Sequence, residues 1–504
     1  MKYVDESGIG AHERRTMKIV PQLDTYPRLV TFGQTTVGKA VLVGAFAIGL
    51  FADRVDAWIG LTVAIALITC FPSRRRLLLS MATLYWLAFH AQWLNWEFLR
   101  EIATAEGQRT DWTLTALVYG TIAAVLCMFA LFFHIARTRR TLLVAKRPVL
   151  FLVTSTLLLL AAADLLPFKG VTRLLVWALL AVTIPYLWYF AYALRDASAK
   201  GSDGVLLQFG TLRPFWGPVN VPYAKSSSNL YRVEVKNAHD LSVVQLKAIK
   251  LLIWVFILRF VLLALNVIVY ADSARSTRLM SLTHWAGPQL VIPELEVALQ
   301  MTGLPVYVAW ASVLAHFAEV ILSLTVGGNI IVACCRMAGF NILRNTYKPL
   351  QARTLSEFWN RYYYYFKELL VEFFFFPMFT RYFKGHRRVR MFAATMAAAT
   401  LGNMIFHFLT GFRYVAELGL WKALAGFQTY FFYATVLGLG IGISQLRGHG
   451  KARLSDDSPW WRKTLATTGV LVFFCLLEVF DQEARSIGLG QCLHFFLRLF
   501  FIPA

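Results

Sequence analysis

The hydrophobic and polar positions of this sequence form long apolar stretches, separated by short segments that carry most of the charges. A helix needs ~20 mostly apolar residues to cross the hydrocarbon of a bilayer, and most of the stretches approach that length. They cover residues 37–52, 57–71, 77–96, 112–136, 149–168, 174–194, 251–270, 305–326, 389–409, 421–443, 465–479 and 487–502. The pattern predicts an all-α, polytopic membrane protein of about 11–12 transmembrane helices, with re-entrant segments among them.

The composition excludes an ordinary soluble domain. Of the 504 residues, 58% are hydrophobic and only 15% are charged, and the mean hydropathy is +0.55. The six cysteines show no C-x-x-C spacing, and most of them lie in apolar stretches, so we interpret them as small core residues. We accordingly predict no metal site and no bound cofactor. The cysteines are Cys70, Cys127, Cys334, Cys335, Cys475 and Cys492.

The net charge of +22 raises the question of a nucleic-acid partner. The basic residues are scattered among the segments between apolar stretches, which is typical of the cytoplasmic face of a membrane protein. We therefore predict a lipid bilayer as the surrounding partner, and no nucleic acid. Residues 1–36 are expected to be a cytoplasmic N-terminal arm, and residues 37–504 a multi-helix transmembrane domain.

Residues 195–250 form the longest polar stretch, and we expect a cytoplasmic loop there. Its basic residues allow two interpretations. They dock an anionic phosphate carrier such as coenzyme A, or they simply mark the cytoplasmic side of the membrane.

The chemically unusual stretch runs from Gly339 to His407. Trp359 and Asn360 place an uncharged amide beside a dense aromatic cluster. His407 lies deep in an otherwise apolar segment, where an ionisable side chain is costly and functional by default. A histidine there can act as a base near neutral pH, although it can also be a packing residue that is hydrogen-bonded between helices.

This stretch resembles the membrane-bound O-acyltransferase family. Bacterial members carry a pattern like G-F-x-x-P-x-x-A-x-S-x-x-E-F-W-R-R-W-H, a later Pro, and then G-G-L-W-H-G. The positions that match are Gly339, Phe340, Pro349, Ala352, Ser356, Glu357, Phe358, Trp359, Phe366, Lys367 and the block from Gly402 to His407. The family's Trp-His pair falls on Trp359-Asn360, which we prefer, or on Tyr362-Tyr363 by a strict count. The family's Gly after the histidine is Phe408 here.

The resemblance implies a family-like core at about residues 305–445 and an acyl transfer reaction. His407 would then be the general base, and Asn360 would position the acyl carbonyl. Trp359, Tyr363 and Lys367 would bind substrate. The donor would be acyl-CoA or another acyl thioester, and the acceptor a hydroxyl on a polysaccharide, a lipid or a protein. A membrane or carrier-protein partner is compatible with this, and we expect a bacterial inner membrane with the N-terminus in the cytoplasm.

The sequence predicts that the two candidate catalytic residues, His407 and Asn360, lie at different depths in the membrane. His407 lies 18 residues beyond Val389, which is ~27 Å along a straight helix at ~1.5 Å per residue. Asn360 precedes the basic patch at 381–390, which belongs on the cytoplasmic side. The two residues meet only if the segment 358–377 re-enters the membrane or the protein encloses a deep funnel.

Two other functions remain open at this stage. A transporter or flippase would use the intramembrane residues Asp164, His316, Glu319, Glu478 and Asp481 as a polar path. His316 and Glu319 share a helical face, which suits half of a metal site, a proton relay or an ordinary interhelical contact. A non-catalytic membrane subunit of a polysaccharide assembly would need neither Asn360 nor His407.

Overall fold

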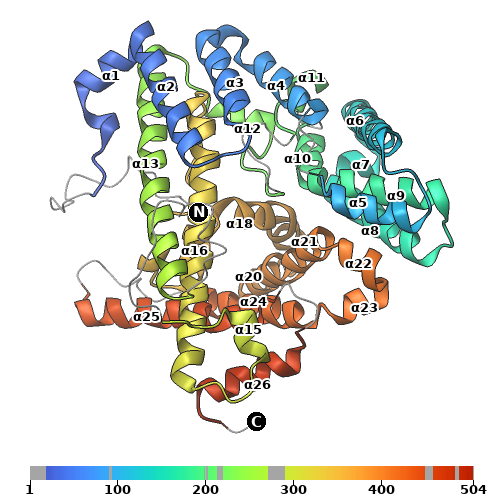
Figure 1. The fold of residues 1–504 in the computed structure, drawn as a ribbon, viewed down its shortest axis with the longest axis vertical. Coiled ribbons are helices and arrows are strands. Elements are labelled where there is room, and N and C mark those ends of the chain that lie inside the picture. The colour runs from blue at the N-terminus through green and yellow to red at the C-terminus, as the bar shows by residue number, and fades with distance from the viewer. Residues whose placement is uncertain are drawn as a thin grey trace.

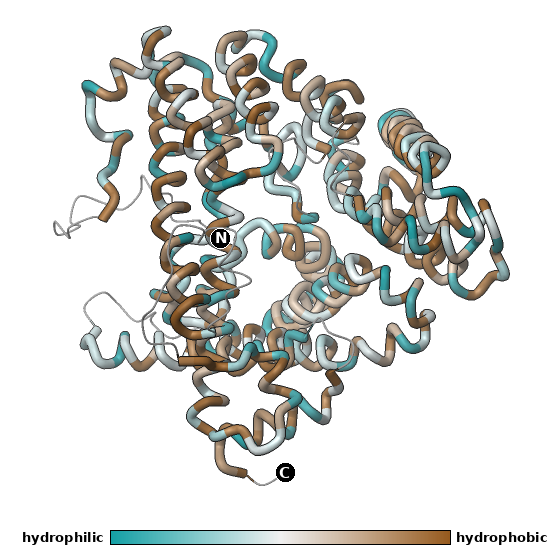
Figure 2. Tube along the Cα trace, viewed as in Figure 1, coloured by the Kyte–Doolittle hydropathy of each residue, from teal (hydrophilic) through white to brown (hydrophobic). Residues whose placement is uncertain are grey.

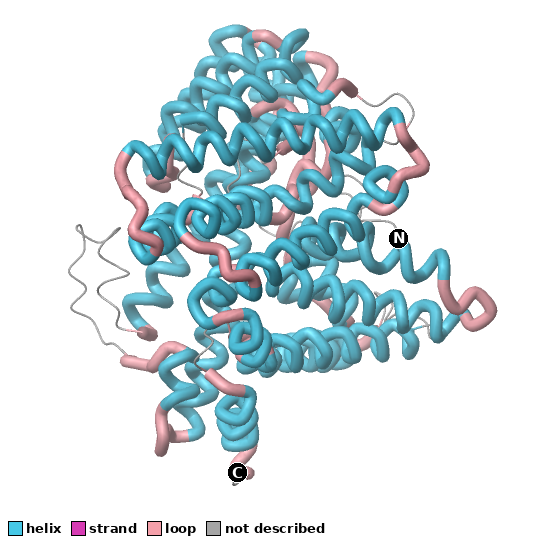
Figure 3. Tube along the Cα trace, turned by 90° about the vertical axis from the view of Figure 1, so that its right-hand side faces the viewer, coloured by secondary structure: helices cyan, strands magenta, loops and turns pink. Residues whose placement is uncertain are grey.

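The computed structural model describes residues 19–89, 94–197, 199, 203–212, 220–270, 290–448, 458–482 and 487–502. Within these ranges every regular element is a helix, as Figure 3 shows. The β-type pairing described there is limited to one antiparallel bridge between Glu234 and Phe340. The prediction of an all-α protein is therefore confirmed.

Eight helices in the described ranges are long and apolar enough to cross a membrane. Figure 2 shows that hydrophobic residues follow the long helices, while hydrophilic ones gather in many of the connections. The protein is thus an integral, multi-pass membrane protein. The eight are α6 (Trp112–Thr138), α8 (Pro148–Leu165), α9 with α10 (Gly170–Ala197), α13 (Ala238–Ile268), α16 (Val306–Met337), α20 to α21 (Arg387–Thr410), α23 with α24 (Leu420–Arg447), and α25 with its last turn (Trp460–Phe480).

Within the described residues, eight helices have the length and hydropathy of a span, compared with the about 11–12 crossings that the sequence predicts. A ninth is reached only if α1 (Pro27–Gln34) and α2 (Thr36–Ala52), which meet at 101°, form one broken span. Other apolar stretches make helices of only 13, 15 and 11 residues. At ~1.5 Å per residue these are ~16–23 Å long, which is less than the hydrocarbon thickness. They are α3 (Trp58–Cys70), α4 (Arg75–Phe89) and α26 (Leu489–Leu499).

The long helices α13 and α16 stand side by side along the longest dimension of the molecule (Figure 1). Helix α13 begins at Ala238, where the side chain of Asn237 accepts a hydrogen bond from the Asp240 N–H at 2.8 Å. This corrects the expected loop at 195–250, because its last 13 residues belong to a helix. An Asn N-cap stabilises a helix start by about 1 kcal/mol.

The described part of the N-terminal arm is also packed on the core. Residues 1–18 lie outside the described residues, but α1 contacts α13, and Asp24 makes an ion pair with Lys250 at 3.1 Å. Arg75, expected to mark a cytoplasmic loop, is buried and donates to the Val235 carbonyl at 2.9 Å. Some of the basic residues therefore hold segments of the described chain together.

Candidate active site

The motif-bearing stretch folds as a helical hairpin. Its outgoing limb consists of α17 (Leu355–Tyr362), α18 (Tyr364–Leu370), a π-helical turn (Val371–Phe375) and α19 (Phe376–Arg381). Its return limb consists of α20 (Arg387–Met396), a second π-helical turn (Ala397–Gly402) and α21 (Asn403–Thr410).

The two limbs run antiparallel. At the turn, the Arg390 guanidinium lies 4.3 Å from the centre of the Phe379 ring. At the far end, the rings of Phe366 and Phe406 are 4.7 Å apart. The hairpin therefore places the aromatic cluster of the outgoing limb against His407.

The two π-helical turns face each other in the middle of the hairpin. A Cβ atom on Gly402 would lie only 2.6 Å from Cδ2 of Phe374, so the glycine is needed for this close approach. Single π-helical turns inside α-helices occur often at functional sites. Here they pair the two limbs just beside His407.

The Ser-Glu-Phe-Trp motif fixes the start of the outgoing limb. The hydroxyl of Thr354 caps α17 by accepting from the Glu357 N–H at 3.1 Å. The Glu357 carboxylate in turn accepts from the Arg353 N–H at 2.8 Å, so it acts as a structural cap. Phe358 is fully buried and stacks on Phe474 with ring centres 4.0 Å apart.

The outgoing limb breaks at Tyr363, between α17 and α18, and a neighbouring segment satisfies the broken backbone. The Asn345 carbonyl accepts from the Tyr364 N–H at 3.0 Å, and its side-chain oxygen accepts from the Tyr365 N–H at 3.3 Å. Thr346 donates to the Tyr362 carbonyl at 2.8 Å. These bonds replace the missing helical ones. The sequence analysis did not identify Asn345 as a residue of the site.

His407 is half-buried and surrounded by aromatic rings. The centre of its ring is 4.4 Å from that of Tyr430 and 5.9 Å from that of Phe366. The Tyr430 hydroxyl donates to the Asn403 side chain at 3.0 Å, four residues before the histidine. Asn403 and His407, the polar members of the Gly402–His407 block, thus both contact Tyr430.

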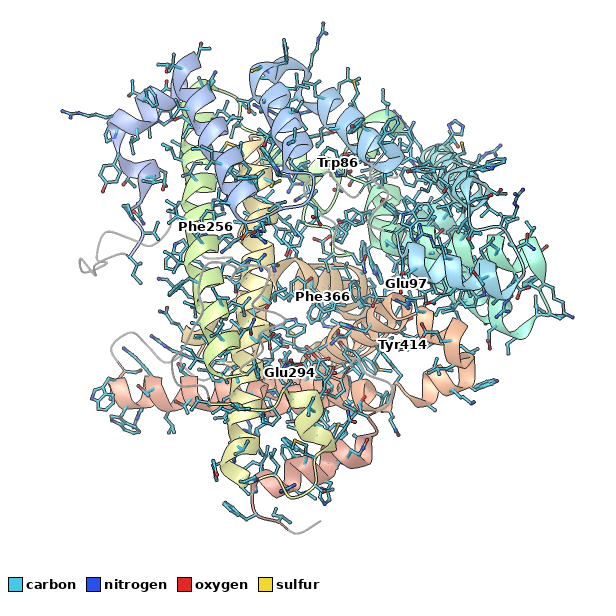
Figure 4. All side chains as sticks on the ribbon, in the orientation of Figure 1. Trp86, Glu97, Phe256, Glu294, Phe366 and Tyr414 are labelled. Atoms are coloured by element: carbon cyan, nitrogen blue, oxygen red, sulfur yellow. The ribbon has the colours of Figure 1, made fainter. Side chains whose placement is uncertain are left out.

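Of the predicted substrate-binding residues, Trp359 and Tyr363 contact the ring of Phe366, which His407 also contacts. Their ring centres are 6.3 Å and 5.3 Å from that of Phe366, which lies near the middle of the molecule (Figure 4). The side chain of Asn360 is half-buried. Because Trp359 of one alignment and Tyr363 of the other both contact Phe366, these contacts do not separate the two alignments.

Lys367 belongs to an ion-pair cluster. Its ammonium group contacts Glu368 and lies 4.7 Å from the centre of the Tyr364 ring. Burial lowers the pKa of Lys367 below its ordinary value, against the opposing effect of Glu368. Lys225 bridges Glu368 at 2.7 Å and Glu372 at 2.8 Å. The ion pairs of Lys225 hold the loop before α12 (Ser227–Arg232) against the hairpin.

A cavity of about 490 Å³ opens beside the hairpin. Tyr363 lines it, together with residues of α16 and of the short helix α15 (Leu295–Gln300). Burial raises the pKa of the Tyr363 hydroxyl, so the phenol keeps its proton at neutral pH and can donate a hydrogen bond. His316 and Glu319, paired in the sequence analysis, both line this cavity.

The polar residues assigned to a transport path are divided between two places. The carboxylate of Asp164 accepts from the Leu420 N–H at 2.9 Å and so caps α23 (Leu420–Ala425). Glu478 is buried, with one carboxylate oxygen 4.0 Å from Nε2 of His316. The structure therefore brings together His316 with Glu478, and gives Asp164 a structural contact on another helix.

No family model matches the chain, and no curated protein matches it. The likeness to the membrane-bound O-acyltransferases therefore rests on the sequence motifs alone.

Proposed function

We propose that this protein is a membrane-embedded acyltransferase that moves an acyl group from a thioester to a hydroxyl. The observation that carries the proposal is the aromatic cluster at Phe366. It joins the two blocks that resemble the acyltransferase family, with Tyr363 on one side and His407 on the other. A π-helical turn, a feature that occurs often at functional sites, also comes directly before the helix that carries His407.

The proposed reaction needs one base and no covalent enzyme intermediate. His407 takes the proton of the acceptor hydroxyl as its oxygen attacks the thioester carbonyl carbon. The C–S bond then breaks, and the leaving thiolate takes a proton from the histidine. The surrounding rings exclude water, which would otherwise hydrolyse the activated acyl group.

A hydrogen-bond donor beside the carbonyl would stabilise the negative charge that develops on its oxygen. Tyr363 supplies a protonated hydroxyl at the cavity wall. Asn360, on the last turns of α17, supplies an amide. We propose Tyr363 for this role on the strength of its ring contact with Phe366, and keep Asn360 as the alternative that the sequence motif suggests.

The donor is proposed to be acyl-CoA or another acyl thioester, and the acceptor a hydroxyl on a polysaccharide, a lipid or a protein. The resemblance to bacterial acyltransferases suggests a bacterial inner membrane as the location, and the distribution of Lys and Arg supports an N-terminus on the cytoplasmic side. A membrane or carrier-protein partner would deliver one of the two substrates.

The test uses the full chain, purified in detergent, with radiolabelled acetyl-CoA and palmitoyl-CoA as donors. A delipidated and a lipid-containing extract of the cell envelope supply acceptors. The proposal expects label to move into one extract only when the protein is present. Failure of both donors with both extracts would contradict it.

The contact between His316 and Glu478 favours a transporter as a second candidate. The pair lies where the cavity meets the buried end of α25, an arrangement typical of proton relays. A pH-sensitive dye inside sealed vesicles tests this directly. Proton flux that requires His316, without acyl transfer, would place the transporter ahead of the enzyme.

A further inference from the structure

The turn of the helical hairpin is a strongly basic surface. Residues 381–390, which form this turn and the start of α20, hold five Lys or Arg side chains and no Asp or Glu. The residues from 381 to 389 are all exposed. The five cations are Arg381, Lys384, Arg387, Arg388 and Arg390. The hairpin thus presents a concentrated positive charge at the end opposite to His407.

Most of these cations have no anionic partner within the part of the chain that the structure describes. The first turn of α20 contains no acidic residue, so its arginines also lie at the positive end of the helix dipole. An anion outside the protein would relieve this repulsion. The cations that make no ion pair or side-chain hydrogen bond among the described residues are Arg381, Lys384, Arg387 and Arg388.

Apolar side chains are interleaved with the cations of the turn. Tyr382 and Phe383 are 55% and 48% exposed, and Val389 is 48% exposed. The backbone of Phe383 is left-handed, with φ at 52°, which costs free energy for a residue that has a Cβ atom. Glycine would suit that position better, so the geometry of the turn does not explain the aromatic ring. Basic and aromatic side chains together are typical of segments that lie at the surface of a bilayer.

The place of the turn in the chain agrees with such a location. The return limb of the hairpin is apolar enough to span a membrane from Arg387 to Thr410. The turn therefore lies where a span leaves the hydrocarbon, at the depth of the lipid headgroups. A soluble acidic peptide would match the charges, but it would provide no apolar phase for the exposed rings.

We infer that the hairpin turn binds the headgroups of anionic phospholipids in the surrounding bilayer. The Lys and Arg side chains pair with the lipid phosphates, and the rings of Tyr382 and Phe383 lie at the boundary between headgroups and acyl chains. This interaction anchors the turn at the membrane surface. It involves neither His407 nor the cavity beside Tyr363, so it does not depend on the proposed acyl transfer.

The experiment measures which lipids surround the turn. Gly385 lies in the turn, is exposed and has open space for a side chain, so Gly385→Cys can carry a fluorescent label. The matched control is Gly120→Cys on α6, which is equally exposed and open but lies in the uncharged stretch 112–133. Both variants carry Cys70→Ser and Cys127→Ser, because these two native cysteines are exposed.

Each labelled protein is placed in phosphatidylcholine nanodiscs that contain a small fraction of a spin-labelled lipid as quencher. The quencher is either phosphatidylglycerol or phosphatidylcholine, with the spin label on the same acyl carbon. At position 385, phosphatidylglycerol should quench at least about 5-fold more strongly, as expected even from one cation near an anionic surface. High salt should reduce this preference. At position 120, the two lipids should quench equally.

The role of the cations is tested by substitution. Arg387→Gln with Arg388→Gln should lower the preference for phosphatidylglycerol at position 385. Arg139→Gln with Arg140→Gln removes the same charge from an exposed segment after α6 and should leave the preference unchanged. Size-exclusion chromatography checks that both proteins remain folded. A preference that survives the first pair of substitutions would overturn the inference.

The unsubstituted turn gives further decisive outcomes. Equal quenching by the two lipids at position 385 would overturn the inference, and so would an equally large preference at position 120. Soluble hexaglutamate, added in excess, should leave the preference at position 385 in place. Loss of the preference on its addition would overturn the assignment to lipid and would indicate a soluble acidic partner.

Discussion

The ring of Phe366 meets the ring of His407 edge to face, with centres 5.9 Å apart and planes inclined at 85°. This contact joins the two limbs of the hairpin and fixes the position of the histidine. Phe366→Leu should therefore lower acyl transfer, because a smaller side chain leaves His407 free to shift, and a misplacement of 1 Å can cost about 100-fold in rate.

The matched control is Phe379→Leu at the other end of the same limb, where the ring contacts Arg390 instead. We expect both variants to remain folded, and only Phe366→Leu to lose activity. The measurement is the transfer rate per folded molecule, with the folded fraction taken from size-exclusion chromatography. Equal rates for both variants would contradict the role of Phe366.

The close contact of Gly402 with Phe374 predicts a large effect from one methyl group. Gly402→Ala should destabilise the protein by about 1–3 kcal/mol, because the added Cβ overpacks the crossing of the π-helical turns. Gly120→Ala on α6, where a Cβ meets open space, is the control and should stabilise the helix by up to about 1 kcal/mol. Thermal unfolding in detergent compares them. A Gly402→Ala protein as stable as the control would show that the limbs lie further apart.

The capping of α18 by Asn345 predicts a difference between two substitutions. Asn345→Ala leaves the Tyr365 N–H without its side-chain acceptor, which should cost about 1–3 kcal/mol of stability. Asn345→Ser keeps an uncharged acceptor oxygen at this buried position and should lose less. Unfolding of the two variants under the same conditions gives the comparison, and a serine variant that unfolds before the alanine variant would contradict the cap.

Glu106 predicts a pH dependence of stability. Its carboxylate accepts from the Gly170 N–H at 2.6 Å and pairs with Arg173, and these contacts lower its pKa below the ordinary value of 4.5. The stabilisation is therefore present above pH 4.5 and is lost as the pH falls below that value. Glu106→Gln removes it, so the difference in Tm between native and variant protein should shrink on acidification. A difference that stays constant with pH would rule out this linkage.

Several features of the fold could be predicted from the sequence because they are local. The stretch 112–136 is almost entirely apolar, and α6 covers it almost residue for residue. The helix α13 was mislocated at its start because residues 238–250 include charged side chains. The cap by Asn237 and the contacts with α1 decide where that helix begins. Such contacts with segments far away in the sequence are invisible in a hydropathy pattern.

The same distinction applies to the candidate site. His407 stands out because a lone ionisable residue in an apolar helix is costly, and Trp359 and Tyr363 belong to a visible motif. Tyr430 and Asn345 carry no such signal. Each is an ordinary residue in its own segment. The role of Tyr430 follows from its hydrogen bond to Asn403, 27 residues earlier, and that of Asn345 from its hydrogen bond to Tyr365, 20 residues later. The cavity likewise combines Tyr223 with Glu294 and Tyr363, which no local spacing connects.

The measurement that tests the central claim most directly is acyl transfer by His407→Ala. The control is His134→Ala, which removes an exposed histidine from another membrane-spanning helix, α6. Removal of a general base should lower the rate of label transfer from radiolabelled acyl-CoA by about 10²–10⁴-fold, while His134→Ala keeps the native rate. Both proteins should unfold at the native temperature. A folded His407→Ala protein that retains full activity would contradict the assignment of His407 as the base.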